Sequence, residues 1–213
     1  MTSRANSWLI VTPGPKDEGA DGDCILYIKQ SDKRVDQAGR LNTPSRPNNG
    51  TVRNTITSGW LDSDVDVADF AQQPWYKWRM RIGAVEVLDT WSPASGKYLF
   101  DGLQHCKTFD LRKLDTSACD SLEGMFRGCT EVVQLLDLDR LDVSKVRSTA
   151  QMFMNCLALR AVSVHGWKTD AITIFDGMFS GAEPYVLADE NQAKFLDLVV
   201  PSGASGTWKK CNG

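Results

Sequence analysis

The sequence predicts an α/β fold in which one short unit is copied and stacked into a solenoid, with a β-rich region in front of it. The first observation is a Met-Phe pair that recurs at 125–126, 152–153 and 178–179, with Leu99–Phe100 one step earlier. The phenylalanines are 26, 27 and 26 residues apart, and an interval of this size is typical of a stacked supersecondary unit. The second observation is a short run of alternating apolar and polar residues after each of the first three phenylalanines, which indicates a half-buried strand.

Residues 1–73 carry no repeat and are predicted to form a β-rich N-terminal region or cap. Two apolar, β-branched runs, Trp8–Thr12 and Cys24–Lys29, indicate strands, and the Gly- and Pro-rich stretch between them indicates a loop. The alternating run Thr51–Thr57 indicates a third strand, after a polar loop at 36–50. A cap is expected here because the open end of a stack exposes apolar core and unpaired strand edge.

Residues 74–182 are predicted to form the repeat array, built from short parallel strands and short helical turns. The strands are expected at Phe109–Arg112, Leu136–Asp139 and Val162–His165, where every second residue is apolar. Since each strand is joined to the next by a crossover, neighbouring strands should pair in parallel.

The Met-Phe pair of each unit is expected to lie on a short helical turn. Ser117 and Asp120 fit a capping box at the start of the first such turn. Three residues after each repeat phenylalanine comes a small or apolar residue, as an interior column of stacked units requires: Leu103, Cys129, Cys156 and Ala182.

Residues 183–213 are predicted to close the far end of the array as a C-terminal cap. The β-branched run Phe195–Pro201 favours a last strand. The Gly-Ser-Gly segment that follows, together with Trp208, would cover the end of the stack.

The repeat also resembles a known family. The pattern Leu114-Asp-Thr-Ser, then Met-Phe-x-Gly-Cys129, then Leu-x-Leu, resembles the BspA-like leucine-rich repeats of bacterial surface proteins, also described as the mycoplasma lipoprotein type of repeat. The resemblance covers roughly residues 74–182 and implies a leucine-rich-repeat-like solenoid, adhesion or host contact, and a place at the cell surface or outside the cell. It supplies no catalytic residues. The chain departs from the pattern in its last unit, which has Ala182 in place of Cys and Lys168–Asp170 in place of Asp-x-Ser.

Composition narrows the classes of function. A net charge of −3 gives no electrostatic case for nucleic-acid binding. The six cysteines form no Cys-x-x-Cys pair and only two histidines are present, so neither a zinc site nor any other cofactor is expected. Cys129 and Cys156 hold equivalent repeat positions and are predicted to be small buried fillers. A disulfide between them is the alternative, because adjacent parallel strands lie about 4.8 Å apart.

Two further features of the sequence bear on ions and membranes. The acidic run at 62, 64, 66 and 69 is interpreted as a solvated loop; a calcium loop is the alternative, but the required glycine is missing. No run of about 18 apolar residues exists, so no transmembrane segment is expected. The polar start Met1–Val11 is too short for a signal peptide, so a surface protein would have its signal and anchor outside this chain.

Leucine-rich solenoids present their strand face to partners, which points to a candidate binding surface. If alternate strand positions point inward, six polar side chains form two exposed columns: Asp110, Asp137 and Ser163 in one, and Arg112, Asp139 and His165 in the other. The alternative is that these are ordinary solvated residues, since any half-buried strand needs polar outward positions. The cluster Trp75, Tyr76, Trp78 and Trp91 offers possible aromatic anchors, but tryptophans that enter a repeat stack are more often core or cap.

The sequence thus predicts a non-enzymatic recognition or adhesion module that binds a protein or glycan on a host or neighbouring cell. One alternative is a structural spacer within a larger surface protein. A carboxylate-based glycoside hydrolase is a more distant alternative, because acidic residues are plentiful but no nucleophile motif is present.

Overall fold

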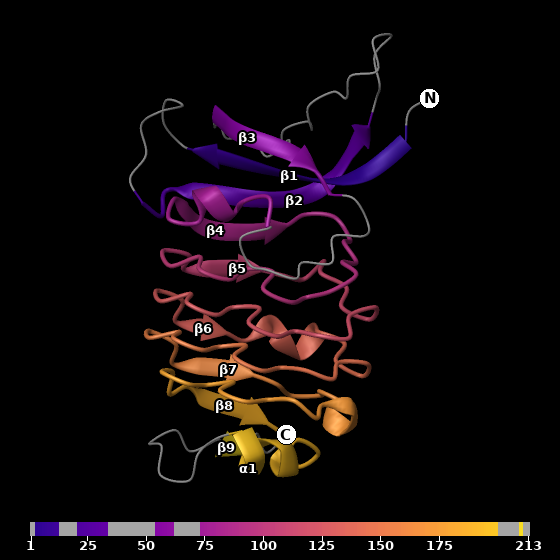
Figure 1. The fold of residues 1–213 in the computed structure, drawn as a ribbon, viewed down its shortest axis with the longest axis vertical. Coiled ribbons are helices and arrows are strands. Elements are labelled where there is room, and N and C mark those ends of the chain that lie inside the picture. Colours follow the sequence, from indigo (N-terminus) through magenta and orange to yellow (C-terminus); the bar gives the residue numbers. More distant parts are fainter. Residues whose placement is uncertain (1–2, 13–20, 34–53, 62–72, 200–208, 211–213) are drawn as a thin grey trace.

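The computed structural model describes residues 3–12, 21–33, 54–61, 73–199 and 209–210, which form a mixed α/β structure with two sheets. The strands are β1 Ser3–Thr12, β2 Cys24–Lys33, β3 Asn54–Trp60, β4 Ile82–Val87, β5 Thr108–Asp110, β6 Gln134–Leu135, β7 Ala161–Ser163, β8 Tyr185–Ala188 and β9 Lys209–Lys210. The helical elements are the 3-10 turns η2 Tyr76–Trp78, η3 Asp137–Arg140 and η4 Thr169–Ala171, and the α-helix α1 Ala193–Val199. Figure 1 shows β4 to β9 one below another in chain order.

The first sheet has the order β3-β1-β2-β4-β5 and joins the N-terminal strands to the repeats. β1 pairs antiparallel with β2 and β3, while β2 pairs in parallel with β4, so β2 is the link between the two parts. The strands expected at Trp8–Thr12 and Cys24–Lys29 are confirmed, and β3 overlaps the expected strand Thr51–Thr57.

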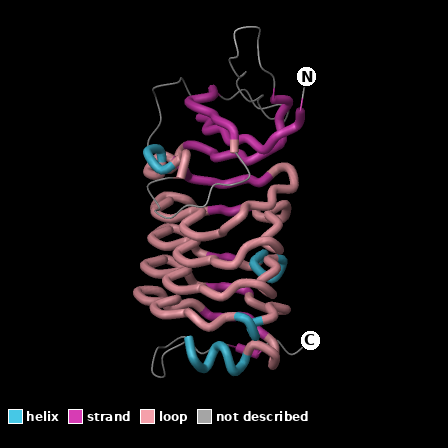
Figure 2. The backbone as a smooth tube through the Cα atoms, turned by 45° about the vertical axis from the view of Figure 1, so that its right-hand side comes forward, coloured by secondary structure: helices cyan, strands magenta, loops and turns pink. Residues whose placement is uncertain are grey.

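The second sheet, β6-β7-β8-β9, is parallel throughout. Gln134 lies opposite Ala161, and Ala161 lies opposite Tyr185, so partners on neighbouring strands are separated by about one repeat of sequence. The expected parallel pairing is therefore confirmed, both here and between β4 and β5. Most of the remaining chain in this part is loop and turn, and the short strands lie one below another in a single column (Figure 2).

Four turn segments, at residues 96–102, 122–128, 149–155 and 175–181, lie one on another beside the strands. In each of the first three, four alternate N–H groups donate to the carbonyl of the residue just before the next segment and to three alternate carbonyls within it. Phe126 N–H, for example, donates to the Met152 carbonyl at 2.9 Å, and Phe153 N–H donates to the Met178 carbonyl at 2.8 Å. All twelve bonds run the same way, from N–H groups of one segment towards the segment that follows it in sequence.

The expectation of helical turns at the Met-Phe pairs is wrong. The third and seventh residues of every turn segment have a positive φ, which no α-helix of L-residues allows. These residues are Tyr98, Gly102, Gly124, Gly128, Gln151, Asn155, Gly177 and Gly181. The predicted capping box is absent too, because Asp115 Oδ1 accepts from the Ser117 N–H at 3.0 Å in a local Asx turn.

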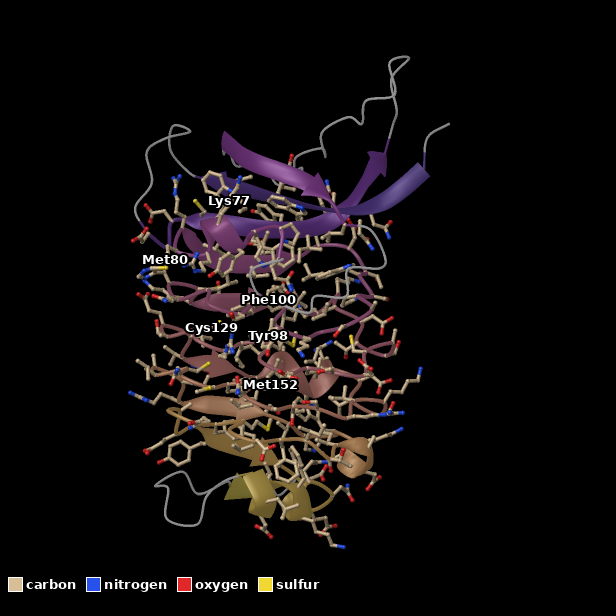
Figure 3. All side chains as sticks on the ribbon, in the orientation of Figure 1. Lys77, Met80, Tyr98, Phe100, Cys129 and Met152 are labelled. Atoms are coloured by element: carbon tan, nitrogen blue, oxygen red, sulfur yellow. The ribbon has the colours of Figure 1, made fainter. Side chains whose placement is uncertain are left out.

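The repeat phenylalanines form one buried ring column, as the sequence predicts. Ring centroids of Phe100 and Phe126 lie 5.8 Å apart, those of Phe126 and Phe153 lie 5.8 Å apart, and those of Phe153 and Phe179 lie 5.2 Å apart. Trp75 extends the column beyond Phe100, with centroids 6.4 Å apart. Phe100, Cys129 and Met152 mark successive levels of this interior (Figure 3).

The cysteines beside the ring column are buried free thiols, so the expectation of small fillers is confirmed for Cys129 and Cys156. Each also makes a polar contact that the sequence does not reveal. Cys129 Sγ donates to the Phe100 carbonyl at 3.2 Å, and Cys156 Sγ donates to the Phe126 carbonyl at 3.0 Å. The thiol column therefore bonds each repeat to the one before it.

The tryptophans that enter the stack are core residues. Trp75 and Trp91 are buried, and Trp78 packs against the core from the side. Trp75 Nε1 donates to the Leu99 carbonyl at 3.3 Å, and Gln73 Nε2 donates to the Tyr98 carbonyl at 3.3 Å. The side chains of Trp75 and Gln73 thus donate to main-chain carbonyls of the first turn segment, at the N-terminal end of the stack.

Two of the predicted strands are wrong. In both segments the buried residues have the spacing of a helical element and not the alternation of a strand. Residues 137–140 form η3, because Leu135, Leu138 and Leu141 are buried at a period of three while Leu136 is exposed. The strand lies just before it, at β6. At the C-terminal end α1 replaces the expected strand at Phe195–Pro201, since Gln192, Phe195 and Leu196 are buried at helical spacing.

Several sequence-based expectations fall outside the described residues. They are the acidic run at 62–69, the polar loop at 36–50 and the contribution of Trp208. Within the described ranges, no helix is long and apolar enough to cross a membrane.

Candidate functional site

A groove opens on the strand face where the two sheets separate, between β5 and β6. The parallel ladder runs from β4 to β5 and again from β6 to β9, but it is interrupted between Thr108–Asp110 and Gln134–Leu135. Two adjoining hollows, of about 470 and 540 Å³, occupy this break. We call them together the strand-face groove.

The floor of the strand-face groove is apolar. Phe109 is half-buried and packs edge-on against Phe126, with ring centroids 5.2 Å apart, and against Phe100 at 5.5 Å. The equivalent place in β7 holds Val162, which is fully buried. The break in the ladder thus lies beside a side chain that is larger and less buried than its counterpart in β7. Val133 and Leu136 line the same floor and are 46% and 43% exposed, so apolar surface is available to a partner.

The rim of the strand-face groove is charged. Its ionisable members come from β4, from β5 and the residues just after it, and from η3, and they include both signs: Glu86, Asp110, Arg112, Asp137 and Arg140. Arg112 holds Asp110 with two bonds, Nε to Oδ1 at 2.9 Å and Nη2 to Oδ2 at 2.6 Å, while 62% of the Arg112 side chain remains exposed.

The ion pair fixes the charge of the rim. The hydrogen bonds from Arg112 lower the pKa of Asp110, and the same bonds raise the pKa of Arg112. Asp110 is therefore ionised at neutral pH. The groove presents fixed charges of both signs around an apolar floor.

The structure brings three of the six predicted site residues together at this groove: Asp110, Arg112 and Asp137. Asp139 is exposed on η3, but it lines neither hollow. Asp137 and Asp139 lie on a 3-10 turn, so the expectation of two straight columns of strand residues is wrong for both.

The last residue of each predicted column also differs from expectation. Ser163 is buried, with 7% of its surface exposed, so its predicted place on an exposed face is wrong. β7 is an inner strand between β6 and β8, and both Val162 and Ser163 are buried on it. His165 is exposed and lies 3.6 Å from Asp189 through Nε2 and Oδ2, away from the groove.

Sequence reasoning missed the residues that make the groove a cavity. Alternation predicts an interior place for Phe109 and a strand position for Leu136, and neither prediction reveals a groove. A usable signal was the run Val133–Leu136, which has too many apolar residues for a half-buried strand that alternates. Arg140 carried no signal, because it becomes a rim residue only through η3.

The described residues also bear on metal chemistry. No group of three or more His, Cys, Asp or Glu side chains that could hold a metal ion occurs among them. The residues that line the strand-face groove supply charged, hydrogen-bonding and apolar groups.

Comparison with known proteins gives one family. A family model described as a mycoplasma protein of unknown function, DUF285, matches residues 84–192, which is just over half of the chain. No curated protein and no solved structure matches the chain. The matched range includes β5 to β8 and every residue that lines the strand-face groove. The chain therefore belongs to the DUF285 family of mycoplasma proteins of unknown function.

Proposed function

We propose that this chain is a recognition module that binds a partner through the strand-face groove. The stacked repeats are a leucine-rich-repeat-like solenoid of the BspA-like kind, displayed at the cell surface or secreted, and the partner is a protein or glycan on a host or neighbouring cell. The observation that carries the proposal is the groove itself. It is the one place among the described strands where the ladder opens and exposed apolar side chains stand beside fixed charges.

The composition of the groove favours a protein partner. Buried apolar contact at the centre with a polar rim is the usual anatomy of a protein interface. Val133 and Leu136 supply the apolar centre, and Arg112 and Arg140 supply the guanidinium groups that such interfaces favour. A glycan would use the rim alone.

A carboxylate-based glycosidase is less well supported. Such an enzyme needs one carboxyl with a raised pKa as its general acid. Arg112 lowers the pKa of Asp110, which is the opposite direction. A spacer role has no observation in its favour, since a spacer does not need a groove lined by exposed apolar residues.

The test is binding of the labelled protein to host cells, with variants matched for exposure. Leu136→Ser and Arg140→Ala alter the groove, whereas Ile174→Ser and Arg147→Ala alter equally accessible positions elsewhere. We expect each groove variant to weaken binding about fivefold to thirtyfold, because an interface anchor contributes about 1–2 kcal/mol. The control variants should bind as the unaltered protein does, and all four should keep their melting temperature.

Treatment of the cells decides the class of partner. Protease treatment should abolish binding, and enzymatic removal of glycans should leave it intact. Binding lost only on glycan removal would make the partner a glycan. If groove and control variants bind alike, or if no cell binding occurs, the groove is not the recognition site.

A further inference from the structure

The last turn segment leaves a row of N–H groups without an acceptor in the described structure. By the pattern of the first three segments, the N–H groups of Phe175, Gly177, Phe179 and Gly181 should donate to carbonyls of a following segment. Within the described residues no carbonyl accepts from any of the four. The carbonyls of the fourth segment, by contrast, accept hydrogen bonds from the third segment. Within the described residues the fourth segment therefore has a bonded row of carbonyls on one side and an unbonded row of N–H groups on the other.

Matched glycines show that this edge is open. Gly124 and Gly177 hold the same place in their segments and have φ of 60° and 65°, yet Gly124 is buried and Gly177 is exposed. A cavity of about 700 Å³ lies against residues 175–183 of this edge. Leu157 and Leu198, which are 61% and 67% exposed, form its apolar sides.

The opposite end of the stack shows what a closed edge looks like. There the carbonyls of Leu99 and Tyr98 accept from Trp75 Nε1 and Gln73 Nε2, and the Trp75 ring stacks on Phe100. Phe179 ends the ring column at the other side. In the described residues no ring stacks on its outer face, although α1 covers the neighbouring core through Phe195, whose ring lies 6.1 Å from that of Phe175.

We propose that the open edge at residues 175–181 binds an extended polypeptide segment of a partner protein, which runs parallel to it and supplies carbonyl oxygens at every second residue. The main-chain groups that this row leaves without a partner in the described structure are N–H donors, so its occupant must present acceptors at a spacing of two residues, as a main chain does. The occupant places an apolar side chain between Leu157 and Leu198 and continues the column over Phe179. A second copy of this chain docking by the same end is excluded, because it would set N–H groups against N–H groups.

The first experiment measures amide hydrogen exchange on the full chain by NMR. In the free protein the four N–H groups of the open edge should exchange at least about a hundredfold faster than those of Gln151, Phe153 and Asn155, which hold the same bonds in the third segment. Protection of the open-edge amides in the free protein would show that the chain itself already fills the edge, and would overturn the proposal.

The second experiment adds a peptide as a probe. The peptide with the sequence of residues 172–182 carries the carbonyl row that the third segment uses within the stack, and the same residues in reversed order serve as its control. We expect the forward peptide to slow exchange of the four open-edge amides and the reversed peptide to leave them unchanged. Equal effects of both peptides would contradict a defined parallel register.

Variants locate the binding. Leu157→Lys should weaken the peptide at least about tenfold, because it removes one apolar wall. Ile174→Lys alters an exposed apolar residue of the next repeat that does not line the cavity, and it should have no effect. If both lysine variants act alike, or if neither changes peptide affinity, the cavity is not the site.

Discussion

Asp110 and Arg112 show how two neighbouring side chains set the charge of the strand-face groove. Because the pKa of Asp110 is depressed in the folded protein, the pair stabilises the fold at pH values above the ordinary carboxyl value of about 4. That contribution is lost as the pH falls through the folded-state pKa.

Replacement of Arg112 tests this pair. We expect Arg112→Ala to return the pKa of Asp110 towards about 3.9, as followed by the carboxyl carbon in an NMR titration. Arg140→Ala is the control, since Arg140 makes no recorded bond to Asp110. A pKa of Asp110 that stays low in Arg112→Ala would mean that another group holds the carboxylate.

The buried cysteine thiols should not react with thiol reagents in the folded protein. Burial raises the pKa of Cys119 to about 11 and of Cys156 to about 12, so almost no reactive thiolate exists at pH 8. In a Cys211→Ser background, we expect a thiol reagent to label no cysteine of the native protein and all five after denaturation. Rapid labelling of Cys156 at pH 8 would contradict its burial.

At the scale of one repeat, the turn segment depends on residues that accept a positive φ. Gly124 has a second constraint, because a Cβ at this position would lie 2.4 Å from the ring of Tyr98. That ring is held in place: Tyr98 Oη donates to Glu123 Oε1 at 2.6 Å, and the Arg127 guanidinium lies over the ring at 4.8 Å. At Gly177 a Cβ would meet nothing closer than 3.7 Å.

The two glycines therefore form a matched pair. Gly177→Ala should lower the free energy of unfolding by about 1–2 kcal/mol, the cost of a left-handed residue with a side chain. Gly124→Ala should cost about 1–3 kcal/mol more, because the ring must move as well. Urea denaturation measures both losses, and Tyr98→Ala in the Gly124→Ala background should recover part of the difference. Equal losses at the two positions would refute the packing argument.

Only part of the structure of the repeat unit could be predicted from the sequence. The ring column was predictable, since Phe126 and Phe153 recur at a fixed period with small residues three places later. The turn segments were not, because their positive-φ positions hold Tyr98 and Gln151 as well as glycines. Leu136–Asp139 alternates as a strand would, and only packing shows that the apolar period there is three. The strand-face groove depends on that packing and so could not be predicted.

Across the whole molecule, one hydrophobic core runs from Trp8 in β1 to Leu196 in α1. Trp75 joins the N-terminal sheet to the repeats, since its ring lies 6.3 Å from that of Trp8 and 6.4 Å from that of Phe100. The parallel pairing of β2 with β4 makes the same connection through the backbone. The two parts should therefore unfold together.

Trp75→Ala tests this coupling. We expect a loss of about 3–5 kcal/mol in the free energy of unfolding, as for other buried aromatic residues cut to alanine. Hydrogen exchange should become faster both in β2 and in the turn segment 96–102. Trp75→Phe keeps the ring contacts and should cost less. Faster exchange confined to β1, β2 and β3 would show that the sheet and the repeats unfold separately.

The common direction of the bonds between turn segments gives the molecule an electric dipole along its length. Each peptide unit has a moment of about 3.5 D, and aligned units add. The peptide units therefore contribute positive potential near Gly181 and negative potential near the segment at 96–102. The carboxylates of Asp176 and Glu183 line the Gly181 end, so the row of N–H groups offsets part of their negative charge, and both effects weaken as ionic strength rises.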